Sequence, residues 1–212
     1  MTQPIIVTGT DTGIGKTIFS AALTQALSAT YWKPVQSGLE EETDTQAVTR
    51  LTGCTALPET YRLQIPASPH FSAEEEGVLI DVENLTLPEI DGPLVVEGAG
   101  GLMVPLTRET LYIDLFKKWQ APIVLCARTG LGTINHSLLS IEALRARGCN
   151  LLGIVFIGEE VADSERTIAE YAGVKKLGRL PLLKEITPET IRTAFAENFR
   201  LEDFRAQTGE TA

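Results

Sequence analysis

Residues 5–17 of the chain read IIVTGTDTGIGKT, an apolar run that ends in a glycine-rich turn, and residues 16–29 have helical spacing. A turn of this kind between a strand and a helix gathers backbone N–H groups and the positive helix end around an anion. Its last residues, Gly15-Lys16-Thr17, match the close of a phosphate loop, where the lysine reaches the outer phosphates and the threonine hydroxyl contacts Mg²⁺. The stretch therefore predicts a nucleotide-phosphate loop, although one residue more than usual separates Gly9 from Gly15.

Short apolar runs alternate with helix-like stretches along the rest of the chain. The runs that fit strands lie at residues 4–8, 31–35, 94–96, 123–127, 151–157 and 176–180. The stretches with helical spacing lie at residues 16–29, 43–51, 111–119, 134–147 and 164–171. Strands without polar alternation are buried on both faces, as in a parallel sheet, and the intervening helices supply the crossovers. The pattern predicts one α/β domain over residues 1–212, similar to P-loop NTPases, with a mostly parallel central sheet and helices on both faces.

The composition argues against several classes of protein. The 212 residues carry 18 Lys and Arg against 28 Asp and Glu, and the resulting charge of −10 argues against binding to the phosphate backbone of DNA or RNA. No run approaches about 18 apolar residues, so no membrane span is expected, and the first residues do not resemble a signal peptide. The cysteines, Cys54, Cys126 and Cys149, form no CxxC pair and are typical of reduced thiols in a cytoplasmic protein.

Three charged residues near the ends of predicted strands or the start of a helix are candidates for the site. Glu97 ends an apolar strand before the small residues 98–101, and it fits either a Mg²⁺ ligand or a solvated turn. Asp44 begins a helix and, taken alone, fits an N-cap better than a metal ligand. Lys33 follows a strand, where it is either a surface residue or a second cation that faces the phosphate loop.

Several segments together carry a family resemblance. They are GTDT at 9–12 with GKT at 15–17, WKPVQSG at 32–38, TD at 43–44, SPH at 68–70 with Ala73, VEGAGG at 96–101 and LGTINH at 131–136. In this order they resemble dethiobiotin synthetase, an ATP-dependent enzyme of the biotin pathway, over about residues 4–183. The spacing of the phosphate loop, unusual for a generic P-loop, is the spacing of that family.

The resemblance implies a homodimeric enzyme that joins 7,8-diaminopelargonate to CO₂ with MgATP and releases dethiobiotin, ADP and phosphate. In the family an amine captures CO₂ as a carbamate, the carbamate attacks the γ-phosphate to give a mixed anhydride, and the second amine closes the ring. Because this chemistry brings two anions together, it depends on positioning and charge neutralisation. The resemblance implies catalytic roles for Thr12, Lys16 and Lys33, and Mg²⁺ ligands at Thr17, Asp44 and Glu97.

The other implied contacts fall into two groups. Nucleotide contacts are implied at Gly13, Ile14, Gly15, Lys16, Thr17, Ile18, Asp44, Glu97, Gly98, Ala99, Gly100, Ile157, Gly158, Pro181, Leu182 and Leu183. Substrate contacts are implied at Thr12, Lys33, Ser37, Gly101, Gly132, Thr133, Ile134, Asn135 and Tyr171. In the family the helix that begins near Asn135 comes from the partner subunit and holds the substrate carboxylate at its N-terminus.

Two positions depart from the family pattern. Gly13 stands where many members carry Glu, so a carboxylate beside the phosphates is missing. Ile157-Gly158 replaces a frequent Asn-Asp pair whose asparagine reads the adenine edge, so base recognition would depend on backbone groups near residues 181–183. A pocket without its side-chain donor discriminates poorly between bases, and the substitution predicts a relaxed nucleotide preference.

Two alternatives share the phosphate loop. An amidotransferase-type synthetase usually carries a glutaminase domain, for which the residues after 183 show no Cys/His pair. A nucleotide-switch ATPase of the partitioning or cell-division type carries an extra lysine near the first glycine of the loop, and residues 10–12 contain none. Residues 193–205 include acidic residues and do not form a basic membrane-binding face, which also argues against the switch.

Overall fold

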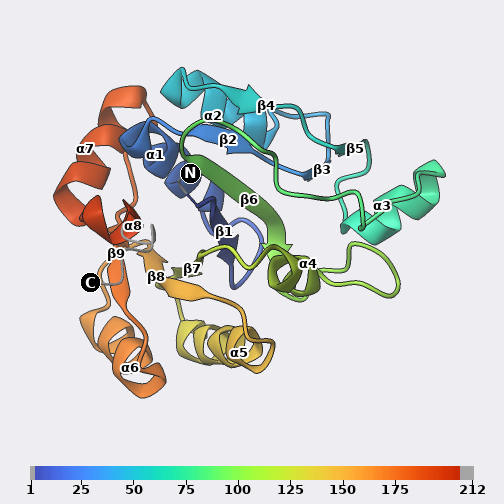
Figure 1. Cartoon of the computed structure of the whole chain (residues 1–212). Helices are drawn as coiled ribbons and strands as arrows, with labels where there is room; N and C mark the ends of the chain where they lie inside the picture. Colours follow the sequence, from blue (N-terminus) through green and yellow to red (C-terminus); the bar gives the residue numbers. More distant parts are fainter. Residues whose placement is uncertain (1–2, 206–212) are drawn as a thin grey trace.

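The computed structural model describes residues 3–205, so both ends of the expected 1–212 domain lie outside the described residues. Its centre is a seven-stranded sheet with the order β4-β2-β6-β1-β7-β8-β9, in which every neighbouring pair is parallel (Figure 1). The strands are β1 (Ile5–Gly9), β2 (Thr30–Trp32), β4 (Ala56–Leu57), β6 (Leu94–Gly101), β7 (Ile123–Arg128), β8 (Leu151–Ile157) and β9 (Lys176–Leu180). The predicted α/β fold with a mostly parallel sheet is confirmed.

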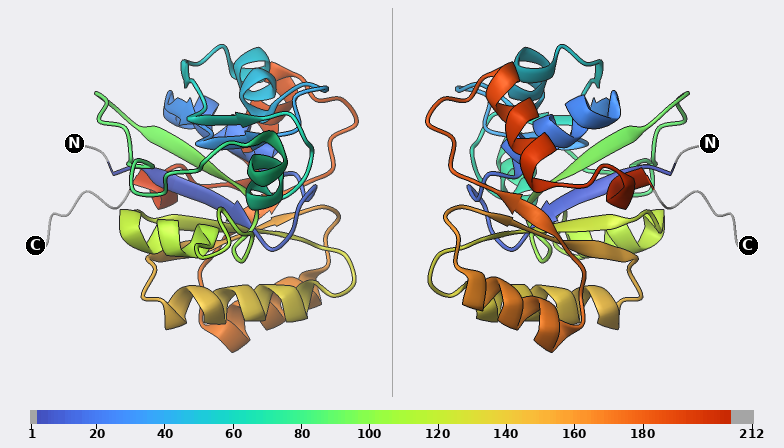
Figure 2. Two further views of the ribbon diagram at one scale, coloured as in Figure 1. Left: turned by 90° about the vertical axis from the view of Figure 1, so that its right-hand side faces the viewer. Right: turned by 90° about the vertical axis from the view of Figure 1, so that its left-hand side faces the viewer.

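Helices cover both faces of this sheet, as Figure 2 shows. One face carries α1 (Lys16–Leu27), α2 (Asp44–Thr52), α7 (Pro188–Asn198) and α8 (Glu202–Arg205), and the other carries α4 (Tyr112–Trp119), α5 (Thr133–Ala146) and α6 (Ala162–Ala172). Each face of the sheet has its own hydrophobic core, and the side chains of β1 alternate between the two. Ile5 and Val7 pack with α1 and α7, and Ile6 packs with α4. Burial on both faces explains why the strands are uninterrupted apolar runs.

The prediction of one strand at residues 31–35 is wrong. The chain instead forms β2 and, after Pro34, a separate strand β3 (Val35–Ser37), which pairs in parallel with β5 (Tyr61–Leu63) in a small second sheet. Pro34 has no N–H to continue the ladder, so the strand ends there and the chain changes sheets. The short helix α3 (Pro69–Glu76) packs against this second sheet and was not predicted.

The central strands bring the candidate residues to one edge of the sheet. β6 lies between β1 and β2, and its Glu97 pairs with Val7 of β1. The carboxyl ends of parallel strands share an edge, so the loop after β1, Lys33 after β2 and Glu97 on β6 are neighbours there. Within residues 3–205, no helix combines the length and the apolar character needed to cross a membrane.

Candidate active site

The phosphate loop joins β1 to α1 and takes its shape from two glycines. Gly13 and Gly15 have φ values of 70° and 95°, in the left-handed region that side chains with a Cβ disfavour. Gly15 is the N-cap of α1 and provides no side-chain cap, so the first N–H groups of the helix are not occupied by a capping side chain. Lys16 is 6% exposed and folds back over the loop, where its Nζ donates to the Asp11 carbonyl at 2.7 Å. Burial lowers the pKa of Lys16 from its ordinary value.

Thr17, in the first turn of α1, connects the two candidate carboxylates. Its Oγ1 lies 2.8 Å from Asp44 Oδ1 and 3.0 Å from Glu97 Oε1. Asp44 can point at Thr17 because Thr43 is the N-cap of α2, in a reciprocal capping box with Gln46. The interpretation of Asp44 as an N-cap is therefore wrong. Glu97 is 1% exposed, so its interpretation as a solvated turn residue is wrong as well.

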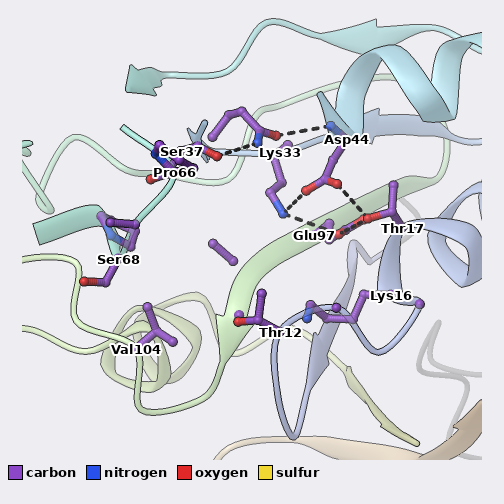
Figure 3. A pocket seen from close by; sticks show the side chains of 17 residues that line it. Thr12, Lys16, Thr17, Lys33, Ser37, Asp44, Pro66, Ser68, Glu97 and Val104 are labelled. Carbon is purple, nitrogen blue, oxygen red and sulfur yellow. Dashed lines mark hydrogen bonds and ion pairs between the residues drawn. The ribbon is translucent and has the colours of Figure 1, made fainter. Parts of the chain in front are cut away.

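Lys33 lies beside both carboxylates, as Figure 3 shows. Its Nζ is 2.6 Å from Asp44 Oδ2 and 3.3 Å from Glu97 Oε1, and it donates to the Gly98 carbonyl at 3.2 Å. The side chain is almost fully buried, so it is not a surface residue. Burial alone would lower the pKa of Lys33, but the charges of Glu97 and Asp44 outweigh burial and raise this pKa above its ordinary value.

The oxygen atoms of Thr17, Asp44 and Glu97 are the donor set that Mg²⁺ prefers. Residues 3–205 contain no cluster of three or more His, Cys, Asp or Glu side chains that could enclose a metal. Two carboxylates and a hydroxyl leave coordination positions for water and phosphate oxygens, which is how Mg²⁺ usually binds beside a nucleotide. The donor set therefore fits a magnesium ion shared with a triphosphate.

Two side chains to which the sequence analysis assigned no role contact the residues that carry the carboxylates. Tyr31 is fully buried, and its hydroxyl donates to Glu97 Oε2 at 3.0 Å. Burial, followed by the charge of Glu97, raises the pKa of Tyr31, so its hydroxyl keeps its proton. Gln36 accepts from the Asp44 backbone N–H at 3.2 Å and donates to the Ser37 carbonyl at 3.0 Å. Asp44 and Glu97 thus each form a hydrogen bond with a residue other than Thr17 and Lys33.

A cavity of about 560 Å³ opens over this cluster. The predicted site residues that line it are Thr12, Gly13, Gly15, Lys16, Thr17, Lys33, Ser37, Asp44, Glu97, Ala99 and Gly100. The lining residues that were not predicted are Gln36, Pro66, Ala67, Ser68, Pro69 and Val104. Gln36 and Ser68-Pro69 lie in family segments and could have been found from them. The Ser37 hydroxyl is buried and has no hydrogen-bond partner among residues 3–205, so it is available to a ligand in the cavity.

Other predicted contacts lie apart from this cavity. Ile14, Ile18, Gly98 and Gly101 adjoin it in sequence but do not line it. Residues 132–135 form the N-terminus of α5, where Asn135 is exposed, and Tyr171 is 82% exposed near the end of α6. Since α6 starts at the carboxyl edge of the sheet and leads into β9, its end points away from the cavity of its own chain.

The predicted base contacts at residues 157–158 and 181–183 lie on the other side of the phosphate loop. The Ile157 side chain is buried in the core, and its Cγ2 lies 3.0 Å from where a Cβ on Gly15 would be. The Ile157 side chain thus packs against the phosphate loop at Gly15. Pro181 and Leu183 line a second hollow of about 300 Å³ with residues of α7, and Leu182 between them is 66% exposed.

Comparisons with known proteins show the family to which the chain belongs. A family model described as an AAA domain matches residues 3–190. The "ATP-dependent dethiobiotin synthetase BioD" of Rhodopseudomonas palustris (strain HaA2) is 66% identical over 207 residues, 96% of this chain and 97% of that protein. The chain belongs to the dethiobiotin synthetase family. The relative with the same name from Agrobacterium fabrum is 59% identical over 96% of this chain and 98% of its own length.

Solved structures with the same fold as this dethiobiotin synthetase family member include ATPases of other families. A ParA family ATPase from Chlorobium tepidum superposes with a TM-score of 0.56 at 12% identity, covering 92% of this chain and 98% of its own. The Aquifex aeolicus MinC:MinD cell division protein complex gives a TM-score of 0.57 at 12% identity, with coverages of 99% and 97%. At this identity the likeness shows the fold alone. The switch-ATPase alternative is therefore not favoured against near full-length ligase relatives.

Proposed function

We propose that this chain makes dethiobiotin from 7,8-diaminopelargonate and CO₂ with ATP, and releases ADP and phosphate. The observation that carries the proposal is one cavity in which the phosphate loop, the buried Lys33 and the carboxylates of Asp44 and Glu97 meet. Family membership supplies the reaction, and the cavity supplies the charges that the reaction needs. A carbamate and a triphosphate repel each other, so the enzyme must neutralise both where they meet.

The proposed sequence has three bond-forming steps. An amine nitrogen of the substrate attacks CO₂ and loses a proton, which gives a carbamate. A carbamate oxygen attacks the γ-phosphorus, the bond to ADP breaks, and a carbamic-phosphoric mixed anhydride results. The second amine attacks the carbonyl carbon, phosphate leaves, and the urea ring closes. The substrate nitrogens lose their protons to water or phosphate overall, so the diamine, CO₂ and ATP are consumed and no further co-reactant is needed.

The side chains have separate tasks in this proposal. The loop amides and Lys16 bind the ATP phosphates. Thr17, Asp44 and Glu97 hold Mg²⁺, which when bound supplies positive charge to the outer phosphate oxygens. Lys33 places its ammonium between the carbamate and the γ-phosphate.

Smaller groups complete the pocket on the substrate side. We assign Thr12 and the free Ser37 hydroxyl to the substrate or to the reacting oxygens, because both line the cavity. The N-terminus of α5 would take the substrate carboxylate, since its N–H groups form an anion site.

The α5 contact requires a second copy of the chain. Asn135 does not line the cavity of its own chain, and Leu131 and Leu139 beside it are 102% and 57% exposed. Exposed leucines on and just before a helix that carries a predicted substrate contact support a homodimer with shared sites.

Mixing two defective variants tests the shared site. Lys33→Met breaks the site of its own subunit, and Asn135→Ala breaks the site of the partner. In an equal mixture, half of the dimers are mixed and one of their two sites is intact, so about one quarter of the wild-type activity should return. If no activity returns after subunit exchange, Asn135 either acts in the site of its own subunit or belongs to no site. Light scattering of each variant checks that dimers form.

Product formation tests the main proposal. Purified protein with 7,8-diaminopelargonate, bicarbonate, Mg²⁺ and ATP should give dethiobiotin, detected by mass spectrometry, with one ADP per product. Omitting the diamine should abolish most ADP release, because phosphoryl transfer needs the carbamate. Steady ADP release without the diamine, and no dethiobiotin with it, would instead favour a nucleotide-switch ATPase.

A further inference from the structure

Tyr31 contacts the site from within the sheet. On β2 it pairs with Val95 of β6, and Glu97 is two residues further along on the same side, so the tyrosine ring points toward the carboxyl edge of the sheet. Its hydroxyl donates to Glu97 Oε2 at 3.0 Å, and both side chains are almost fully buried. Tyr31 does not line the cavity, and nothing in the family segments includes it.

The two oxygens of the Glu97 carboxylate therefore have different partners. Oε1 lies 3.0 Å from Thr17 Oγ1 and 3.3 Å from Lys33 Nζ, both cavity-lining groups. Oε2 accepts from Tyr31, and among residues 3–205 it has no other hydrogen-bond donor. The carboxylate is thus oriented with one oxygen toward the cavity and one toward the sheet.

We propose that Tyr31 is a positioning residue that makes Glu97 a one-oxygen ligand, by keeping Oε2 engaged so that only Oε1 is offered to a divalent cation. The inference rests on the proposed metal site and adds to it a way of choosing the metal. Mg²⁺ needs near-octahedral geometry with short bonds, whereas Ca²⁺ takes more oxygens and accepts a carboxylate through both. A carboxylate restricted to one oxygen favours Mg²⁺ over Ca²⁺.

Tyr31→Phe removes the hydroxyl and keeps the ring. Tyr112→Phe is a matched control: Tyr112 is also fully buried, and its hydroxyl has no hydrogen-bond partner among residues 3–205. Mn²⁺ is bound to the full chain in the presence of ADP and followed by electron paramagnetic resonance. Titration with Mg²⁺ or Ca²⁺ displaces the Mn²⁺ and gives the affinity of each protein for each metal. Loss of an outer partner of a metal ligand typically weakens the metal by roughly 10-fold or more. Tyr31→Phe should therefore bind Mg²⁺ roughly 10-fold more weakly and lose less affinity for Ca²⁺.

The Mg²⁺-to-Ca²⁺ affinity ratio separates positioning from general stability. If the substitution only destabilised the site in general, the affinities for Mg²⁺ and Ca²⁺ would fall by the same factor. The ratio of the two affinities would then be unchanged, and that result would overturn the inference. Tyr112→Phe should keep the wild-type ratio. If instead both phenylalanine variants shift the ratio equally, the effect does not come from the Tyr31 hydrogen bond.

Two further measurements keep the inference apart from the proposed function. Glu97→Gln, with Tyr31 unchanged, should weaken Mn²⁺ binding. If it does not, the proposed metal site is wrong, and so is the role of Tyr31 that depends on it. A crystal structure of the wild-type chain with MgADP does not depend on any variant folding. One Glu97 oxygen should lie within bonding distance of the metal, with Oε2 still on Tyr31, and two bonded oxygens would overturn the inference.

Discussion

Replacing Lys33 with methionine tests the centre of the proposed mechanism, because it removes a charge and keeps most of the side-chain volume. Lys33 is 3% exposed and its Nζ is 2.6 Å from Asp44 Oδ2 and 3.3 Å from Glu97 Oε1. Without the ammonium, two carboxylates share the Thr17 hydroxyl, and no other side chain of residues 3–205 forms an ion pair with them. We expect the variant to lose both stability and turnover, for different reasons.

The loss of stability follows from the geometry. Removing one partner of a buried ion pair typically costs about 3–5 kcal/mol. The Asp44 side chain is 29% exposed, so water screens part of the repulsion, and the lower end, about 3 kcal/mol, applies. For a chain of this size, that corresponds to a fall of roughly 6–12 °C in the melting temperature. Mg²⁺ should restore more stability to the variant than to the wild type, because it supplies the missing positive charge.

The loss of turnover follows from the transition state. Removing one charged or hydrogen-bonding group that stabilises developing charge typically lowers kcat by about 10²–10³-fold. Affinity for ADP should change only a few-fold, because the phosphates are held by the loop and Lys16. Rapid-quench turnover, ADP titration and thermal unfolding with and without Mg²⁺ measure the three effects. If ADP affinity falls as far as turnover, Lys33 binds nucleotide rather than acting in the reaction, and our assignment is wrong.

Three further outcomes are expected. Burial would raise the pKa of Asp44, but the charge of Lys33 and the hydrogen bonds from Lys33 and Thr17 outweigh burial and hold this pKa below its ordinary value. The stabilisation from Asp44 is therefore present above about pH 4 and is lost as pH falls. Asp44→Asn should flatten the acid limb of the curve of unfolding free energy against pH, and parallel limbs for the variant and the wild type would contradict this. Gly98→Ala should destabilise by about 1–3 kcal/mol in denaturant unfolding, because its Cβ would lie 2.8 Å from Phe116 Cζ, and an unchanged midpoint would show that the ring moves aside. Values of kcat/KM for ATP, CTP and GTP should agree within about tenfold, since Ile157 and Gly158 supply no amide to read the base; a strong preference for ATP would contradict the relaxed specificity.

The sheet could be predicted because parallel strands buried on both faces leave long apolar runs in the sequence. The second sheet could not: β3 and β5 have three residues each, too few for a periodic pattern. Helix α3 was missed for a related reason. It buries only Pro69, Ser72 and Ala73, which are small or polar residues and give no apolar stripe.

The site was predictable where a charged residue directly follows an apolar run, and unpredictable where a polar tip lies within a strand pattern. Lys33 follows β2, and Glu97 follows the apolar residues of β6, although the strand itself continues to Gly101. The topology of a parallel sheet brings such residues together. Tyr31 and Gln36 lie within β2 and β3, where a strand pattern indicates burial but not what a polar tip contacts. The choice between N-cap and ligand for Asp44 also needed the structure, because Thr43 and Asp44 are both good caps and only geometry shows which one is used.

The charge of the cavity predicts how nucleotide and metal depend on each other. The chain carries −10 overall, and the charged residues that line the cavity, Lys16, Lys33, Asp44 and Glu97, cancel one another. A triphosphate therefore meets no net positive charge from these side chains, and a Mg²⁺ ion held by Asp44 and Glu97 would supply the missing charge. Isothermal titration should show ADP binding at least roughly 10-fold tighter with Mg²⁺ than with EDTA, and Asp44→Asn should shrink that ratio. Equal affinities in both buffers would mean that the loop and Lys16 bind phosphates unaided, and that the carboxylates serve only to hold Lys33.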